Sequence, residues 1–199
     1  SLVPPTPGPL YVADQLGVDV RDIHVVTGDT AQFHWGTGTF ASRGAVVAAN
    51  AINAAALNVR KKILAWGSKL LEVPEDELEL ADGQVRIADV PEKAISLGEL
   101  AVIANPMRGT VEPGTEPGLE STDYFGPQYG ATASGVHAMI VEVDPETMML
   151  EIRRYVTVED CGTVLNPLIL EGQIQGGVSM GIGNAYYEQL VYDENGQLL

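Results

Sequence analysis

The chain has 199 residues, 45% of them hydrophobic, and its 27 acidic side chains outnumber the 11 basic ones to give a net charge of −16. An acidic surface of this kind argues against nucleic-acid binding and against an anionic membrane, because both are bound through clustered Lys and Arg. The single cysteine excludes an intramolecular disulfide and a Cys-rich zinc or iron–sulfur site, and it favours a reducing, cytoplasmic setting. No apolar run reaches the ~18–20 residues that a membrane span needs.

The first half of the sequence predicts one lobe. Residues 1–8 are proline-rich and predict an irregular lead-in to an α+β lobe over 9–106. Residues 9–18 predict a short helix that ends at Gly17, and residues 22–29 predict a buried strand that turns at Gly28-Asp29.

A long helix follows the Gly- and Thr-rich loop at 28–41. Its apolar residues recur at alternating steps of three and four, which places them on one face of a helix over 42–71: Ala49, Ile52, Ala56, Val59, Ile63, Trp66 and Leu70. Next, the alternation around Asp82-Gly83 predicts a small hairpin. The capping-box pattern Ser96-x-x-Glu99 then begins a helix that ends before Pro106.

The second half predicts another lobe. Residues 107–118 are rich in Gly and Pro and predict a linker, followed by a lobe over 119–199. That lobe comprises an antiparallel hairpin of two β-rich runs joined at 145–147 and a C-terminal helix that starts near Asn166. The sequence stops soon after a predicted Asn-Gly turn, so we expect a truncated chain. Helices and antiparallel strands in separate runs indicate the α+β class.

Cys161 has an environment unlike that of a nucleophile. A reactive cysteine needs a nearby cation or a helix N-terminus to lower its pKa, whereas Cys161 directly follows Glu159 and Asp160. We therefore expect a small buried residue at a strand-to-helix corner. The two acids do not form an acid–base pair, because adjacent residues of a strand point to opposite faces.

The three histidines show no metal-ligand spacing. His24 and His137 lie within apolar strand patterns, where a structural role with satisfied hydrogen bonds is expected. His34 lies beside Trp35 in the polar loop, where contact with a substrate or cofactor remains open. The sequence contains no phosphate-binding P-loop, no dinucleotide fingerprint and no nucleophile elbow.

Two segments suit an anionic, flat ligand. In GTGTFASRG the loop enters a long helix, where backbone N–H groups, Ser42 and Arg43 favour a phosphate; the alternative is a plain helix start with Ser42 as N-cap and Arg43 exposed. In CGTVLNPLILEGQIQGG, glycines and the amides of Gln173 and Gln175 favour a planar ligand. The alternative there is a helix packed tightly through Gly176 and Gly177.

Three segments together resemble a known family: VTGDT…GTGTFASRGAVVAANAI, EPGLESTDYF and VEDCGTVLNPLILEGQIQGG. They are similar to the large subunit of the molybdenum hydroxylases, the xanthine dehydrogenase and aldehyde oxidase superfamily, and most of all to the aerobic carbon monoxide dehydrogenase-type large chain. The resemblance covers about residues 9–199, and the spacing D-C-G-x-x-x-N-P with E-G-Q-I-x-G-G is its most specific part.

The resemblance implies a molybdopterin cofactor, usually the cytosine dinucleotide in bacteria, and oxidation of a small substrate with water as the oxygen source. It implies electron transfer to a 2Fe-2S small subunit and an FAD-binding medium subunit. It also implies a set of cofactor-binding residues: Ala41, Ser42 and Arg43 at the pterin or phosphates, Gln173 at the pterin, and Cys161, Gly162 and Asn166 in the wall of the dinucleotide pocket. Molybdenum would be held by the pterin, so no residue of the chain is expected to ligate a metal.

The sequence also departs from this family. A Gly-Gln-Gly-His-type motif is missing before the first helix, and the family's catalytic glutamate would lie beyond Leu199, so we expect no turnover by this chain alone. The rest of the large subunit, or a complementary split subunit, would complete the site, and the lone chain would self-associate through uncovered apolar surface. The alternative is a non-catalytic acidic binding module that kept the fold and lost the cofactor.

Overall fold

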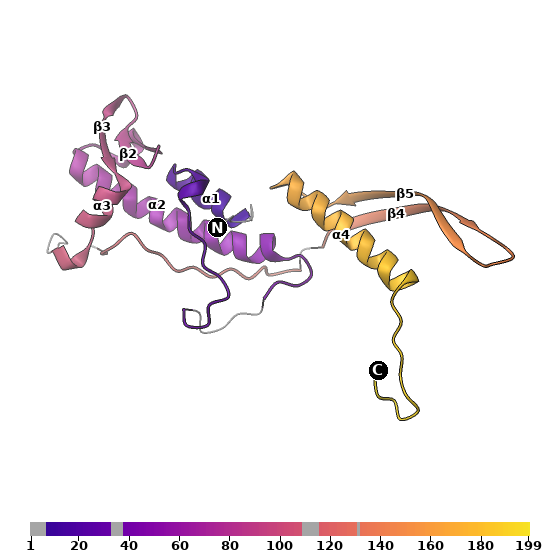
Figure 1. Ribbon diagram of the computed structural model, residues 1–199. Helices are drawn as coiled ribbons and strands as arrows, with labels where there is room; N and C mark the ends of the chain where they lie inside the picture. Colours follow the sequence, from indigo (N-terminus) through magenta and orange to yellow (C-terminus); the bar gives the residue numbers. More distant parts are fainter. Residues whose placement is uncertain (1–6, 33–37, 109–115, 131) are drawn as a thin grey trace. The chain divides into compact units, whose positions relative to one another are not determined.

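The computed structural model describes residues 7–32, 38–108, 116–130 and 132–199, and the chain forms two units, Ser1–Gly126 and Pro127–Leu199 (Figure 1). Both contain helices and antiparallel strands, which confirms the α+β class. The predicted boundary at 107–118 falls partly on residues 109–115, outside the described residues, and stays a prediction. None of the described helices is long and apolar enough to cross a membrane.

The first unit is built on two helices that pack against a small sheet. Helix α1 spans Pro7–Leu16, and α2 spans Asn50–Leu71 after a π-helical turn at Ala45–Ala49. Four residues of the predicted apolar face are buried, which confirms the face at these positions: Ala49, Ala56, Ile63 and Trp66. The helix itself begins later than predicted, because the turn before it uses a different hydrogen-bond pattern.

The sheet of the first unit has three strands in the order β1-β2-β3, all antiparallel. Strands β1 (Leu78–Ala81) and β2 (Gln84–Ile87) form the predicted hairpin, and β3 (Val90–Ser96) was not predicted. Helix α3 (Leu97–Ile103) begins as expected, with the Ser96 hydroxyl accepting a hydrogen bond from the Glu99 amide at 3.1 Å. The core between sheet and helices comprises Ile63, Trp66, Leu78, Val85, Ile87, Leu100 and Ala104.

The strand predicted over 22–29 is not formed within the described residues. A short 3₁₀ turn occupies Val20–Asp22, and the residues after it pair with no strand. Val25 and Val26 are 38% and 39% exposed. The physical reason is that a strand needs a partner for its backbone groups, and an apolar run alone does not supply one.

The second unit contains a long hairpin and a helix. Strands β4 (Ser134–Val143) and β5 (Leu150–Asp160) pair antiparallel, as predicted. Their turn is held by the Asp144 carboxylate, whose pKa is lowered because it accepts hydrogen bonds from the backbone N–H of Glu146 and from Thr147. Helix α4 spans Pro167–Tyr186, also as predicted, and none of its described residues is buried.

Candidate functional site

The entry to the long helix has an unusual backbone. Ala41 and Ser42 adopt left-handed φ angles of 52° and 50°, although neither is glycine. Such a conformation costs about 1–3 kcal/mol per residue and tends to persist at ligand-binding sites. The strain argues that this turn is kept for its shape.

Arg43 is held at the start of the helical segment. Its guanidinium carbon lies 4.2 Å from the ring centroid of Phe40, and its amide donates to the Phe40 carbonyl at 3.2 Å. The side chain is half-buried. A cation stacked on an aromatic ring keeps its N–H donors available at the ring edge, so Arg43 is suited to a phosphate.

The plain helix start considered for this segment is wrong in one respect. The N-cap of the π-helical turn is Gly44, and no side chain caps it, so Ser42 is not the N-cap. The reason is that Gly44 already has helical φ and ψ angles, whereas Ser42 lies two residues earlier with a left-handed φ of 50° instead of the extended backbone of an N-cap. Backbone N–H groups at such a start are suited to an anion.

The corner between β5 and α4 is open. The Asp160 carboxylate accepts a hydrogen bond from the Gly162 amide at 3.1 Å, and Gly162 has a left-handed φ of 74°. Cys161 is a free, exposed thiol. The prediction of a strand-to-helix corner is confirmed, but the burial predicted for Cys161 is wrong, because no described element of the second unit covers this corner.

Helix α4 continues this surface. Asn166 is its N-cap, with the side-chain oxygen accepting from the Ile169 amide at 3.3 Å, and Gln173 follows seven residues later on the same face. Apart from their chain neighbours and the nearby backbone of α4 itself, no described heavy atom lies within 4 Å of a Cβ built at Gly176 or Gly177. The tight packing considered for these two glycines is therefore absent from the described residues, and the face is open beside Gln173.

The segment EPGLESTDYF, which also carries the family resemblance, forms part of an extended strap over 116–126, which Figure 1 shows along α2. Lys62 donates to the Glu120 carbonyl and to the Glu116 carboxylate, both at 2.7 Å. The Asn58 amide donates to Asp123 at 2.8 Å. Sequence reasoning named this segment only for its resemblance; the polar residues Asn58 and Lys62 on α2 were the signal that it would be tied to the helix.

The histidines differ in their surroundings. His137 lies in β4, as predicted, with Nδ1 3.0 Å from the Tyr155 hydroxyl and Nε2 3.3 Å from the Glu159 carboxylate. His24 lies in the unpaired stretch and is exposed, so its predicted place in a strand is wrong. His34 lies outside the described residues.

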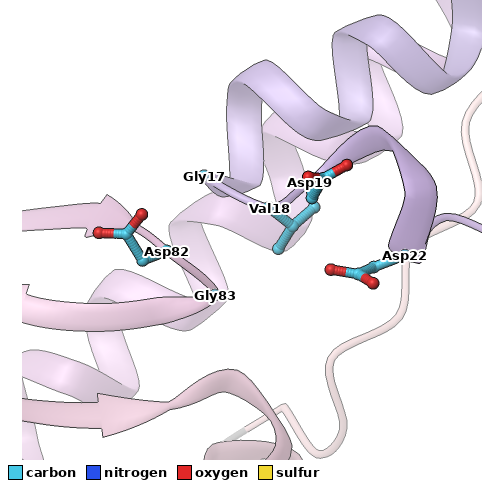
Figure 2. A pocket seen from close by; sticks show the side chains of 6 residues that line it. All are labelled: Gly17, Val18, Asp19, Asp22, Asp82 and Gly83. Atoms are coloured by element: carbon cyan, nitrogen blue, oxygen red, sulfur yellow. The ribbon is translucent and has the colours of Figure 1, made fainter.

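A pocket of about 400 Å³ lies in the first unit, and none of its lining residues is a predicted site residue (Figure 2). It lies between the end of α1 and the β1–β2 turn, and its charged lining consists of Asp19, Asp22 and Asp82. A hydrogen bond from Arg21 lowers the pKa of Asp19 to about 2. Asp19 is paired with Arg21 and Asp82 with Arg86, but no basic residue lines the pocket itself, so it offers no charge for a phosphate.

The predicted binding residues belong to both units. Ala41, Ser42 and Arg43 lie in the first unit, whereas Cys161, Gly162, Asn166 and Gln173 form one open surface of the second. Among the described residues, no group of three or more His, Cys, Asp or Glu side chains is arranged to hold a metal. The donors present are backbone N–H groups, amides and a guanidinium, a set that fits an anionic, planar cofactor rather than a bare ion.

Comparison with known proteins supports the same interpretation. Residues 10–199 match the model of the molybdopterin cofactor-binding domain. The chain is 38% identical to the nicotine 6-hydroxylase large subunit of Paenarthrobacter nicotinovorans and 33% identical to the carbon monoxide dehydrogenase large chain of Afipia carboxidovorans. Each match covers 94% of this chain and 23% of the relative. Quinoline 2-oxidoreductase from Pseudomonas putida 86 superposes with a TM-score of 0.80 at 38% identity, over 98% of this chain and 25% of that one.

The chain therefore spans about a quarter of the length of these relatives. The match to the domain model covers nearly all of the sequence, and several of the relatives are large or molybdenum-binding subunits. The chain belongs to the family of molybdopterin cofactor-binding domains found in the large subunits of molybdenum hydroxylases.

Proposed function

We propose that this chain forms part of the surface that binds molybdopterin cytosine dinucleotide in a molybdenum hydroxylase. The observation that carries the proposal is the open surface formed by Gly162, Asn166 and Gln173. There an N-capped helix start, a side-chain amide and uncovered glycines lie along one helix face. A flat, polar ligand needs this combination of access and hydrogen-bonding groups.

Each predicted residue has a distinct role in this proposal. Arg43 neutralises phosphate charge, and the strained turn of Ala41 and Ser42 presents backbone groups to the pterin or the phosphates. Gln173 pairs with the pterin through its amide. Cys161, Gly162 and Asn166 shape the wall of the dinucleotide pocket, where the lack of a side chain at Gly162 leaves room for the ligand.

When bound, the cofactor would supply two-electron oxidation of a small substrate, with water as the oxygen source. The partners that we propose are a 2Fe-2S small subunit and an FAD-binding medium subunit, which would carry the electrons away in the cytoplasm. The catalytic glutamate would be contributed by residues beyond this chain, so we expect the purified chain alone to show no turnover.

The second unit also carries apolar surface that the proposed remainder of the large subunit, or a complementary split subunit, would cover. Val136, Val158 and Leu168 are 68%, 66% and 71% exposed, and the apolar residues of α4 are spread around the helix and not confined to one face. A helix of this kind is typical of a protein interior. Without its partners, we expect the chain to self-associate through this surface.

The proposal is tested by replacing Gln173 with leucine in the complete natural polypeptide, co-expressed with the subunits encoded beside it. We expect cofactor affinity to fall about three- to tenfold, the net worth of one or two lost hydrogen bonds. The measurement is the cytidine nucleotide released per protein after heat denaturation, titrated against limiting cofactor.

Gln175→Leu is the matched control, because Gln175 lies about 200° around the same helix and carries the same side chain. Its cofactor content should match that of the unmodified protein. Equal losses in both variants would contradict the role given to Gln173.

A further inference from the structure

The β4–β5 hairpin has two unlike faces. The period of two places Val136, Ile140 and Val158 on one side, all exposed by more than half. The other side carries a cluster of three polar residues, His137, Tyr155 and Glu159, together with Gly135 and Met139. This cluster lies at the end of the hairpin that leads into the Cys161–Gly162 corner.

His137 links the other two polar members of the cluster. Nδ1 lies 3.0 Å from the Tyr155 hydroxyl, and Nε2 lies 3.3 Å from a Glu159 carboxylate oxygen. The imidazole and phenol rings meet edge to face with their centroids 5.8 Å apart. The contact with Tyr155 is a hydrogen bond, and the contact with Glu159 is an ion pair when the imidazole is protonated. The two contacts together restrict the orientation of the ring.

Glu159 is in turn held against the strand. Its side chain is 22% exposed, compared with 64% and 63% for Glu142 and Glu151, which pair with Arg153 further along the hairpin. The carboxylate lies over Gly135, where a Cβ would come within 2.8 Å of Glu159 Cδ. Gly135 therefore leaves the space that Glu159 occupies.

The carboxylate of the next residue, Asp160, contacts the corner that follows β5 and not the neighbouring strand. Asp160 pairs with Ser134 in the last position of the ladder and accepts from the Gly162 amide at 3.1 Å. Glu159 anchors the strand end to β4, and Asp160 shapes the corner that follows. Gly162 lies only three residues after Glu159. A shift of the backbone at Glu159 would therefore also move Gly162.

We propose that His137 is a positioning residue for the cofactor wall: through Glu159 and Tyr155 it fixes the end of β5 and hence the Cys161–Gly162 corner. The expected effect of His137 on cofactor binding rests on the proposed function. The placement of the corner by His137 is a property of the hairpin itself and has its own measurement.

That measurement is amide hydrogen exchange at residues 160–163 in the complete natural polypeptide with its co-expressed subunits. His137→Ala should raise the exchange rate there about fivefold, the factor expected for one lost hydrogen bond. Gly135→Ala should do the same with His137 intact, because the added methyl group displaces Glu159. His137→Gln, which can still donate to Glu159, should restore most of the protection.

Arg153→Ala is the matched control, since it breaks the pairs with Glu142 and Glu151 at the other end of the hairpin. It should leave exchange at 160–163 unchanged. If all three alanine variants raise exchange equally, His137 acts only on general hairpin stability and the inference is overturned. Unchanged exchange in His137→Ala overturns it as well.

Cytidine content separates this inference from the proposed function. If His137→Ala accelerates exchange and lowers the cytidine content by a similar factor, both are supported. Faster exchange with unchanged cytidine content in His137→Ala would overturn the role of the corner in cofactor binding, while the placement of the corner by His137 would stand.

Discussion

Replacing Gly17 with alanine is expected to lower the free energy of unfolding of the first unit by about 2–4 kcal/mol. About 1 kcal/mol comes from the left-handed φ of 63°, which alanine tolerates poorly, and about 1–3 kcal/mol comes from overpacking. The added Cβ would overlap the backbone of Leu80, and the Gly17 carbonyl, which accepts from the Gly83 amide at 2.8 Å, would be displaced. A backbone atom cannot rotate away as a side chain can.

Gly83→Ala is the matched control for this substitution. Gly83 also has a left-handed φ, of 71°, but apart from its two chain neighbours no described heavy atom lies within 4 Å of its Cβ position. Its cost should therefore be limited to about 1 kcal/mol. Urea titrations followed by fluorescence, with Trp66 buried in the core, measure both variants. Equal losses would show that the contact between the end of α1 and the sheet is not tight.

Replacing Arg43 with alanine is expected to lower the affinity for the cofactor about 10–100-fold. Hydrogen bonds to charged groups contribute roughly 1.5–3 kcal/mol each, and the stacking on Phe40 holds the guanidinium in place before the ligand arrives. The measurement is cytidine content of the assembled protein at limiting cofactor supply. The fold of the first unit should be little affected, since Phe40 itself is 54% exposed.

Two companion variants sharpen the test at Arg43. Arg43→Lys keeps the charge but loses the planar fork, so an intermediate loss is expected. Lys61→Ala removes one positive charge from an exposed position of α2 and should leave the cytidine content unchanged. If Lys61→Ala and Arg43→Ala cause equal losses, the effect arises from net charge and not from a contact made by Arg43.

Elements with a strong local pattern could be predicted from the sequence. Helix α2 shows a regular apolar spacing, and the β1–β2 hairpin turns at Asp82-Gly83, where both residues have positive φ as such a turn requires. Strand β3 could not be predicted in the same way. It contains Pro91, Glu92 and Lys93, which interrupt the alternation, and it forms because β2 offers it a partner.

Whether a residue is buried depends on the segments that pack against it, and these cannot be read from a local sequence pattern. The run at 22–29 is apolar enough for a buried strand, yet it has no partner strand among the described residues and lies exposed. Cys161 is predicted to be buried because its acidic neighbours argue against a reactive thiol, yet the structure leaves it exposed. The proposed site residues came from the resemblance to a known family, whereas the strained turn at Ala41–Ser42 and the contact of His137 with Glu159 could be seen only in the structure.

Molybdenum and cytidine content, measured together, test the central claim most directly. The complete natural polypeptide would be purified after co-expression with its neighbouring subunits, and each would be quantified per protein by elemental analysis and by nucleotide chromatography. We expect near-equal amounts of molybdenum and cytidine nucleotide in the complex. A complex that contains neither, from cells that load another molybdenum hydroxylase normally, would contradict the cofactor-binding function and favour a non-catalytic module.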